Sequence, residues 1–331
     1  MKPKHKRIKG VVFSNLEWRE DIKERMQQDN LDTPKWFANG IISAGYEFRC
    51  EKNPAINLLM SLWKGKKITL LCFNPSLIYL ILFILPLPVK RVSLFQWRPL
   101  GKSSFIKVIL IKLLLLRSDK IVVYSYIAKR YLNRYFKSKQ VEQIGLFVDT
   151  DYFVPKISHS NNKKFILVPG DHKRNETLLN SIAKKLNIHI IRVTRDNNVR
   201  NAVIDLNSES ITVKYKIDFI ELKKLYQDCS AVLIISDSKE IPTGITTLSE
   251  AISSGAPTVI TRGQSCSWPQ EIAKQFPFII ISPAADTDAI SAEIDKAMSM
   301  NRDEYRLSCD VFKNLYLSEK ALSFKWSKIL N

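Results

Sequence analysis

Short apolar runs alternate with stretches of helical periodicity along most of the chain. In the first half, apolar runs of strand length lie at residues 8–13, 68–73, 91–97 and 121–125, and a further strand is expected to begin at 47–50. In the second half they lie at 165–168, 188–193, 231–235, 258–261 and 278–281. Helical patterns lie between or beyond them, at 34–45, 76–85, 105–117, 128–136, 176–185, 219–227, 246–253 and 318–330. Strands that alternate with helices predict parallel sheets covered by helices on both faces.

The two sets of elements are separated by a polar stretch, residues 156–164 (KISHSNNKK), whose composition is that of a linker. We therefore expect an α/β fold of two tandem Rossmann-like, doubly wound domains with a cleft between them. The expected boundaries are 1–155 for the N-terminal domain and 163–315 for the C-terminal domain. Residues 316–331 are expected to form a terminal helix that packs back on the N-terminal domain.

One segment, residues 68–89, carries no charge over 22 residues, so a membrane span is an alternative interpretation. Asn74 and Pro75 interrupt it early, and Pro86 and Pro88 interrupt it late. These breaks favour a strand, a helix that begins near Pro75, and a further strand beyond Pro88.

The charge of +19 is unevenly distributed. Residues 1–150 contain 27 Lys and Arg against 11 Asp and Glu, a net charge of +16, whereas the remainder carries +3. Between Lys52 and Lys139 there are 17 basic residues and a single acid, Asp119. Such a bias predicts a polyanionic partner for this half, either an anionic membrane surface or a nucleic acid.

The basic run is interleaved with Leu and Ile rather than with aromatic residues that stack on bases, which favours lipid over nucleic acid. Within it, residues 105–117 (FIKVILIKLLLLR) predict a helix that either packs one face in a core or lies in a membrane interface. We expect a cytoplasmic protein bound peripherally to the inner face of a membrane, with no nucleic-acid partner.

The five cysteines are scattered, with no CxxC pair and an odd total. This usage indicates reduced, buried thiols rather than a disulfide framework or a zinc site. The basic N-terminus leads into a short apolar run, which is not the pattern of a secretory signal peptide.

Candidate chemistry is concentrated in residues 237–261, which follow the apolar run AVLII at 231–235. Pro242 and Gly244 predict a turn, and a helix follows over 246–253. A loop at the carboxyl end of a parallel strand is where open α/β sheets bind ligands. Gly244 lets backbone N–H groups approach a ligand, and the start of the helix favours an anion such as a phosphate. Glu250 lies within reach of that position, although a helix glutamate in solvent is the simpler alternative.

A second loop, Pro169 to Leu179 (PGDHKRNETLL), has the same placement after a strand. Gly170 permits a tight turn, and His172, Lys173 and Arg174 supply cations just before a helix. Cations combined with helix-end N–H groups predict a diphosphate site, against the alternative of a merely solvated basic pair.

Two segments resemble motifs of the GT-B glycosyltransferases of the family 4 type. GLFVDTDYFVP at 145–155 resembles their interdomain signature, and GITTLSEAISSGAPTVIT at 244–261 resembles their donor-site motif. VPGDHKRNETLL and ELKKLYQDCSAVLII fall in the matching order between them. The resemblance covers about residues 145–262, while the N-terminal half agrees in general layout.

The resemblance implies roles for individual residues. Glu250 matches the glutamate that hydrogen-bonds the donor ribose. The loop whose backbone meets the donor sugar and phosphates corresponds to Gly244, Ile245, Thr246 and Thr247. Lys173 and Arg174 match the cations that neutralise the leaving diphosphate, so no metal and no other cofactor is expected beyond the nucleotide-sugar itself.

The sequence also departs from the family pattern. The first of the family's two motif glutamates would fall at Pro242, so Glu240 is the nearest acid and would need a shifted loop. The glycine-rich turn after the first strand is replaced by SNLEW, and Gln96 stands where the family has a histidine.

Together these features predict a retaining glycosyltransferase that moves a sugar from a nucleotide-sugar donor to a glycan or lipid-linked acceptor in surface polysaccharide biosynthesis. The alternatives are a nucleotide-sugar epimerase of the same fold, and a basic membrane- or nucleic-acid-binding protein with a degenerate donor site. An epimerase would release free sugar and normally has more acids and histidines in its cleft.

Overall fold

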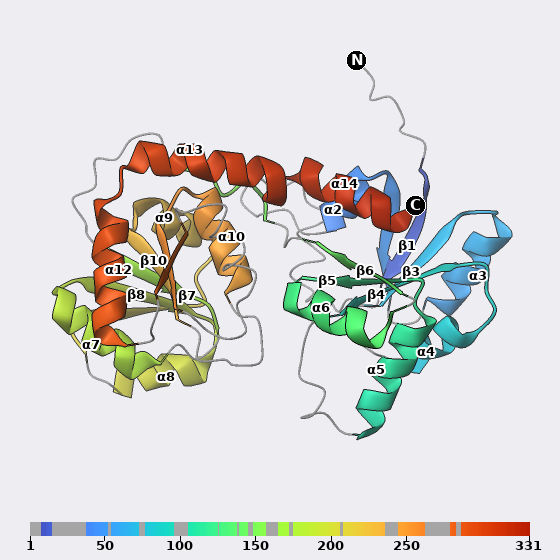
Figure 1. Ribbon diagram of the computed structural model, residues 1–331, viewed down its shortest axis with the longest axis horizontal. Helices are drawn as coiled ribbons and strands as arrows, with labels where there is room; N and C mark the ends of the chain where they lie inside the picture. The colour runs from blue at the N-terminus through green and yellow to red at the C-terminus, as the bar shows by residue number, and fades with distance from the viewer. Residues whose placement is uncertain are drawn as a thin grey trace, which may run out of the picture. The chain divides into compact units, whose positions relative to one another are not determined.

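The computed structural model describes residues 8–14, 38–51, 54–72, 77–95, 105–124, 126–137, 139–144, 148–156, 165–171, 175–205, 208–235, 244–261, 279–282 and 286–331. The chain divides into two compact units, with divisions between residues 145 and 146 and between residues 318 and 319. Each unit is built on its own six-stranded parallel sheet (Figure 1). The last helix, α14, belongs to the N-terminal unit, and the elements from β7 to η2 belong to the C-terminal unit.

The N-terminal unit has the strand order β2-β1-β3-β4-β5-β6. Its strands are β1 (Gly10–Ser14), β2 (Tyr46–Cys50), β3 (Ile68–Cys72), β4 (Lys90–Phe95), β5 (Lys120–Val123) and β6 (Gln140–Gln143). Its helices are α2 (Ala38–Ser43), α3 (Ala55–Trp63), α4 (Leu77–Ile84), α5 (Phe105–Arg117), α6 (Tyr126–Tyr135) and α14 (Glu319–Leu330). The central strands β1 and β3 are buried throughout, including the polar residues Ser14 and Thr69 in their mostly apolar sequences.

The direction of each crossover decides which face of this sheet a helix covers. Strand β2 lies on one side of β1, at one edge of the sheet, and strands β3 to β6 follow in order on the other side of β1. Right-handed crossovers therefore place α2 on one face and α3 to α6 on the opposite face. The core clusters agree, because α2 packs with α14 over one face of β1 and β3, and α3, α4 and α5 share a core over the other.

The terminal helix α14 lies beside α2 (Figure 1). Trp326 is fully buried there, and the Ser43 hydroxyl donates a hydrogen bond to the Glu319 carboxylate. The Tyr46 hydroxyl donates to Oδ1 of Asn331 at 2.8 Å. The other aromatic residue of this helix, Phe324, is exposed.

The C-terminal unit has the strand order β12-β11-β10-β7-β8-β9. Its strands are β7 (Phe165–Pro169), β8 (His189–Thr194), β9 (Ile211–Tyr215), β10 (Ala231–Ile234), β11 (Thr258–Thr261) and β12 (Ile279–Ser282). Its helices are α7 (Glu176–Leu186), α8 (Asn197–Asp205), α9 (Phe219–Asp228), α10 (Ile245–Ser253), α12 (Thr287–Ser299), α13 (Arg302–Phe312) and the short π-helix η2 (Lys313–Leu317). Strand order reverses between β7 and β10, which makes their carboxyl ends the topological switch point of the unit.

Two doubly wound parallel sheets confirm the predicted α/β fold class. The uncharged segment 68–89 contains β3 and α4, and its residues 73–76 lie outside the described ranges. Within the ranges given above, no helix is long and apolar enough to cross a membrane. The sequence patterns did not predict seven of the described elements: α3, β6, α8, β9, α12, α13 and η2.

Candidate functional site

The site predicted from the sequence lies at the switch point of the C-terminal unit. Strands β7 and β10 pair in parallel, with Ala231 opposite Ile166 and Val232 opposite Leu167. Their carboxyl ends therefore meet at one edge of the sheet, where Gly170 follows β7 and Gly244 lies beside Ile234, the last residue of β10.

Gly244 is the N-cap residue of α10 and adopts a left-handed conformation, with φ of 79°. A Cβ atom at this position would overlap the side chain of Ile234, so both the backbone angle and the space require glycine. Because Gly244 offers no side-chain oxygen, the first backbone N–H groups of α10 receive no cap from it. Thr246 is exposed at this helix start, while Ile245 and Thr247 are buried.

Glu250 lies in the second turn of α10 and is partly exposed. Its Oε2 accepts a hydrogen bond of 2.8 Å from the hydroxyl of Tyr226 on α9. Burial raises the pKa of Glu250 to about 7, while the Tyr226 hydrogen bond and the positive charge of Arg195 act in the opposite direction. A carboxylate that is oriented by a neighbour yet still accessible can accept hydrogen bonds from ligand hydroxyls.

Tyr226 is a site residue to which the sequence interpretation gave no role. Its ring is buried, and burial followed by the charge of Glu250 raises the pKa of its hydroxyl well above the ordinary value. Phe153 packs edge-on against it, with ring centroids 5.9 Å apart, and Tyr152 packs on Phe153 at 5.1 Å. Tyr152 and Phe153 belong to the segment DTDYF, so this segment supports Glu250 through Tyr226.

That aromatic segment is itself held by a local turn. Oδ1 of the buried Asp149 accepts hydrogen bonds from the backbone N–H groups of Asp151 and Tyr152, both at 3.1 Å. The short polar side chain of aspartate is suited to this kind of turn. The sequence signal that could have found Tyr226 is its place in ELKKLYQDCSAVLII, a segment already matched to the family.

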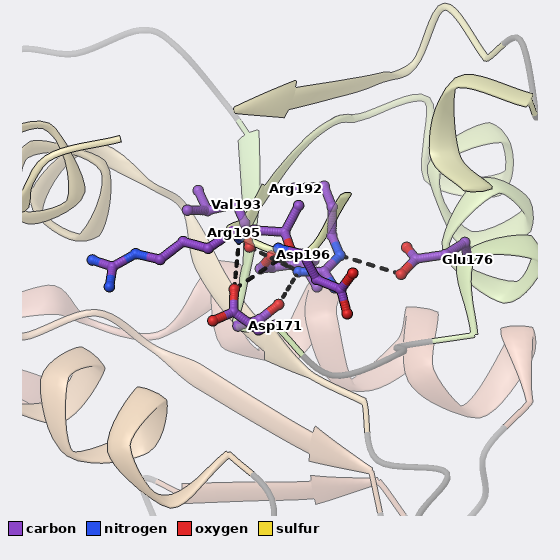
Figure 2. Close-up of polar contacts among 9 residues, drawn as sticks. Asp171, Glu176, Arg192, Val193, Arg195 and Asp196 are labelled. Carbon is purple, nitrogen blue, oxygen red and sulfur yellow. Dashed lines mark hydrogen bonds and ion pairs between the residues drawn. The ribbon is translucent and has the colours of Figure 1, made fainter. Parts of the chain in front are cut away.

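The loop after β7 is fixed by a buried cation. Gly170 has φ of 117°, and its carbonyl accepts a hydrogen bond of 2.7 Å from Nη1 of Arg192 on β8. The same nitrogen donates to the carbonyl groups of Val168 at 3.1 Å and Val193 at 2.8 Å. Nε of Arg192 lies 3.3 Å from the carboxylate of Glu176, the first residue of α7 (Figure 2).

Arg192 has no exposed surface, and its pKa is lowered by burial, an effect that the charge of Glu176 opposes. The sequence interpretation did not single it out, although an arginine inside the apolar strand HIIRVT is a visible signal. It joins the end of β7, the Gly170 turn and the start of α7 into one hydrogen-bonded unit.

Asp171 continues this arrangement. Its Oδ1 accepts a hydrogen bond of 2.6 Å from the backbone N–H of Arg195, at the end of β8. Figure 2 shows the Arg195 side chain directed away from Asp171. Asp171 therefore binds the backbone of Arg195 and not its side chain. The Arg195 guanidinium lies 5.4 Å from the centre of the Phe219 ring. Its positive charge lowers the pKa of Glu250.

The structure thus brings together Gly170, Gly244, Ile245, Thr246, Thr247 and Glu250 at one edge of the sheet. The predicted residues His172, Lys173, Arg174 and Glu240 lie outside the described ranges, so their roles stay predictions. No group of three or more His, Cys, Asp or Glu that could hold a metal ion occurs among the residues with described positions.

Solved structures share this architecture. The Anabaena protein HepE, in complex with UDP and glucose, matches 97% of this chain and 98% of its own, with a TM-score of 0.68 and 9% identity. WaaG, a glycosyltransferase involved in lipopolysaccharide biosynthesis, matches 97% and 99%, with a TM-score of 0.59 and 11% identity. The chain has the GT-B fold. The predicted resemblance is therefore confirmed at the level of the fold.

TarM gives a further GT-B match, with a TM-score of 0.61 and 13% identity over 80% of this chain. The match covers 55% of the TarM chain, so this chain spans about half of that longer protein. No protein-family model matches the sequence, and no curated protein sequence matches it.

Proposed function

We propose that this GT-B chain is a glycosyltransferase that uses a nucleotide-sugar donor, bound at the switch point of the C-terminal unit. The observation that carries the proposal is Glu250, held by the Tyr226 hydroxyl at 2.8 Å and placed one turn beyond an N-terminus that Gly244 leaves without a side-chain cap. A carboxylate suits ribose hydroxyls, and helix-end N–H groups suit phosphates, so the two groups on one helix suit a nucleoside diphosphate.

The donor chemistry proposed here needs charge stabilisation above all. When the bond between the anomeric carbon and the diphosphate oxygen breaks, the electron pair stays on the diphosphate. Lys173, Arg174 and the N–H groups at the start of α10 would stabilise that charge, and Glu240 is proposed beside the donor sugar. The acceptor hydroxyl forms the new bond with retained configuration, and its proton leaves with the diphosphate.

The structural neighbours support a donor of this class. HepE was solved in complex with UDP-glucose, and WaaG is described as a glycosyltransferase of lipopolysaccharide biosynthesis. We infer for this chain an acceptor that is a glycan or a lipid-linked precursor of a surface polysaccharide.

A thermal-shift screen over UDP-, GDP-, ADP- and CMP-sugars tests the proposal. At least one nucleotide-sugar is expected to raise the melting temperature, because a ligand present at about 100 times its Kd stabilises the folded state by about 2.7 kcal/mol. The double variant Lys173→Ala/Arg174→Ala is expected to bind that donor at least roughly tenfold more weakly, since charge-assisted contacts to the diphosphate are lost.

The matched control is Lys184→Ala/Lys185→Ala, which removes two exposed cations from the opposite end of α7 and should leave the shift unchanged. If none of the four classes of nucleotide-sugar raises the melting temperature, the proposed donor binding is wrong. If the donor raises the melting temperature of the Lys173→Ala/Arg174→Ala variant as much as that of the unaltered chain, Lys173 and Arg174 do not contact the donor.

A further inference from the structure

The N-terminal unit exposes apolar side chains on three helices that cover the same face of its sheet. On α3, Ile56, Leu59 and Trp63 follow helical spacing along one side, and Trp63 is 89% exposed. On the opposite side of the same helix, Leu58 is buried in the core. Helix α3 is thus apolar on both its inner and its outer side, which a helix facing water is not.

Helices α4 and α5 repeat this arrangement. On α4, Leu77 and Ile81 are exposed although Tyr79 and Phe83 fill the core. On α5, the exposed positions include Ile106, which is 70% exposed, while Leu114 and Leu115 point inward to two core clusters.

The three outer sides form one surface because the three helices share one core. Residues of α3, α4 and α5 meet in a single hydrophobic cluster over β1 and β3, and α4 packs directly against α5. Figure 1 shows the three helices in succession along one side of this sheet. Exposed apolar side chains gathered on neighbouring helices over one face of a sheet mark an interaction site. We call this surface the α3–α5 face.

Cations accompany the α3–α5 face. Lys64 and Lys67 are exposed after α3, and Lys112 and Arg117 are exposed on α5. Acids are nearly missing from the sequence here, since Asp119 is the single acid between Lys52 and Lys139. The Asp119 carboxylate accepts a hydrogen bond of 2.7 Å from the backbone N–H of Arg91.

We propose that the α3–α5 face docks on an anionic lipid bilayer, with its apolar side chains inserted among the acyl chains and its cations at the headgroups. The apolar side chains of this surface are complementary to acyl chains, and the flanking Lys and Arg are complementary to anionic headgroups. A second copy of the chain is a poorer occupant, because a symmetric contact through this face would bring two sets of cations together. The surface extends beyond residues 102–120, which the sequence alone had marked.

Vesicle flotation of the full chain tests this proposal, using phosphatidylcholine vesicles with and without about 30% phosphatidylglycerol. Binding is expected to the anionic vesicles and to weaken with salt. Leu59→Ser/Trp63→Ser is expected to reduce the partition coefficient roughly tenfold or more, because two large apolar side chains no longer insert. Both positions are exposed, so thermal stability should be unchanged.

The matched control is Ile204→Ser/Leu307→Ser, which removes two comparably exposed apolar side chains from separate places in the C-terminal unit. It is expected to float like the unaltered chain. A charge-reversed variant, Lys112→Glu/Arg117→Glu, is expected to lose the preference for anionic vesicles.

Three results would overturn the proposal. The first is absence of flotation with anionic vesicles, whether or not the chain retards RNA in a gel shift. The second is a dimer that Leu59→Ser/Trp63→Ser dissociates while flotation is unaffected. The third is flotation that depends on Lys112 and Arg117 but not on Leu59 and Trp63, because binding would then not involve insertion. None of these readouts depends on sugar transfer, so the proposed function can fail or succeed separately.

Discussion

Replacement of Glu250 by glutamine is expected to weaken binding of the nucleotide-sugar roughly 10- to 100-fold. Hydrogen bonds to a charged group contribute about 1.5–3 kcal/mol, and glutamine keeps one acceptor oxygen without the charge. The Tyr226 hydroxyl can still donate to that oxygen, so the side chain stays in place. Calorimetric titration of both proteins with the donor found in the thermal-shift screen measures the difference.

The same residue predicts how donor affinity varies with pH. With a pKa of about 7, the Glu250 carboxyl is mostly protonated at pH 6 and mostly ionised at pH 8. If the ligand hydroxyls bind the carboxylate, affinity is expected to rise about tenfold from pH 6 to pH 8. A nucleotide-sugar is a suitable ligand because its diphosphate does not titrate in this range. Glu250→Gln is expected to remove this dependence on pH.

Stability provides an internal check on the Glu250 variant. Its folded-state pKa is raised above the unfolded value of about 4.5, so the stability linked to its protonation is present at low pH and lost as pH rises through about 7. The ligand-free Glu250→Gln protein should therefore be more stable than wild type at pH 8. Glu221→Gln, a partly exposed residue in the first turn of α9, is the matched control for donor affinity. Equal affinities of wild type and Glu250→Gln at pH 8 would show that Glu250 is a structural residue.

Replacement of Arg192 by methionine is expected to destabilise the C-terminal unit by about 3–5 kcal/mol. It removes one partner of a buried ion pair and leaves the Glu176 carboxylate without its cation. The carbonyl groups of Val168 and Gly170 lose their hydrogen bonds as well. Native-state hydrogen exchange of β7 and α7 at increasing urea concentration measures the loss in this unit separately from the rest of the chain.

Two companion variants make the Arg192 result interpretable. Adding Glu176→Gln to Arg192→Met should recover part of the lost stability, because the unpaired buried charge is then gone. Arg200→Met removes an exposed cation from α8 and should change stability by less than about 0.5 kcal/mol. A loss at Arg192 no larger than at Arg200 would contradict the role given to this cation.

The fold could be predicted from sequence because its central strands are fully buried. β1, β3, β7 and β10 are continuous apolar runs, and Gly or Pro residues mark several ends of the helices beside them. The turn at Gly244 was visible for a related reason, since glycine is required there by both its φ angle and its contact with Ile234. A backbone requirement of this kind restricts the position to one residue type, so it can be recognised in the sequence.

Features that depend on contacts distant in sequence could not be predicted in this way. The Tyr226 partner of Glu250 lies 24 residues away, and the Arg192 partner of Glu176 lies 16 residues away. Helix α3 was missed altogether, because its apolar outer side gives no contrast between buried and exposed positions. The same loss of contrast in α3, α4 and α5 concealed the extent of the α3–α5 face.

Hydrogen exchange of the full chain with and without the bound nucleotide-sugar tests the donor site most directly. We expect slower exchange in peptides that cover residues 170–179 and 244–253, and smaller changes around Tyr226. Two results at saturating donor would contradict a donor site at the switch point of the C-terminal unit. In the first, neither peptide is protected, and in the second, only strands β1 to β6 are protected.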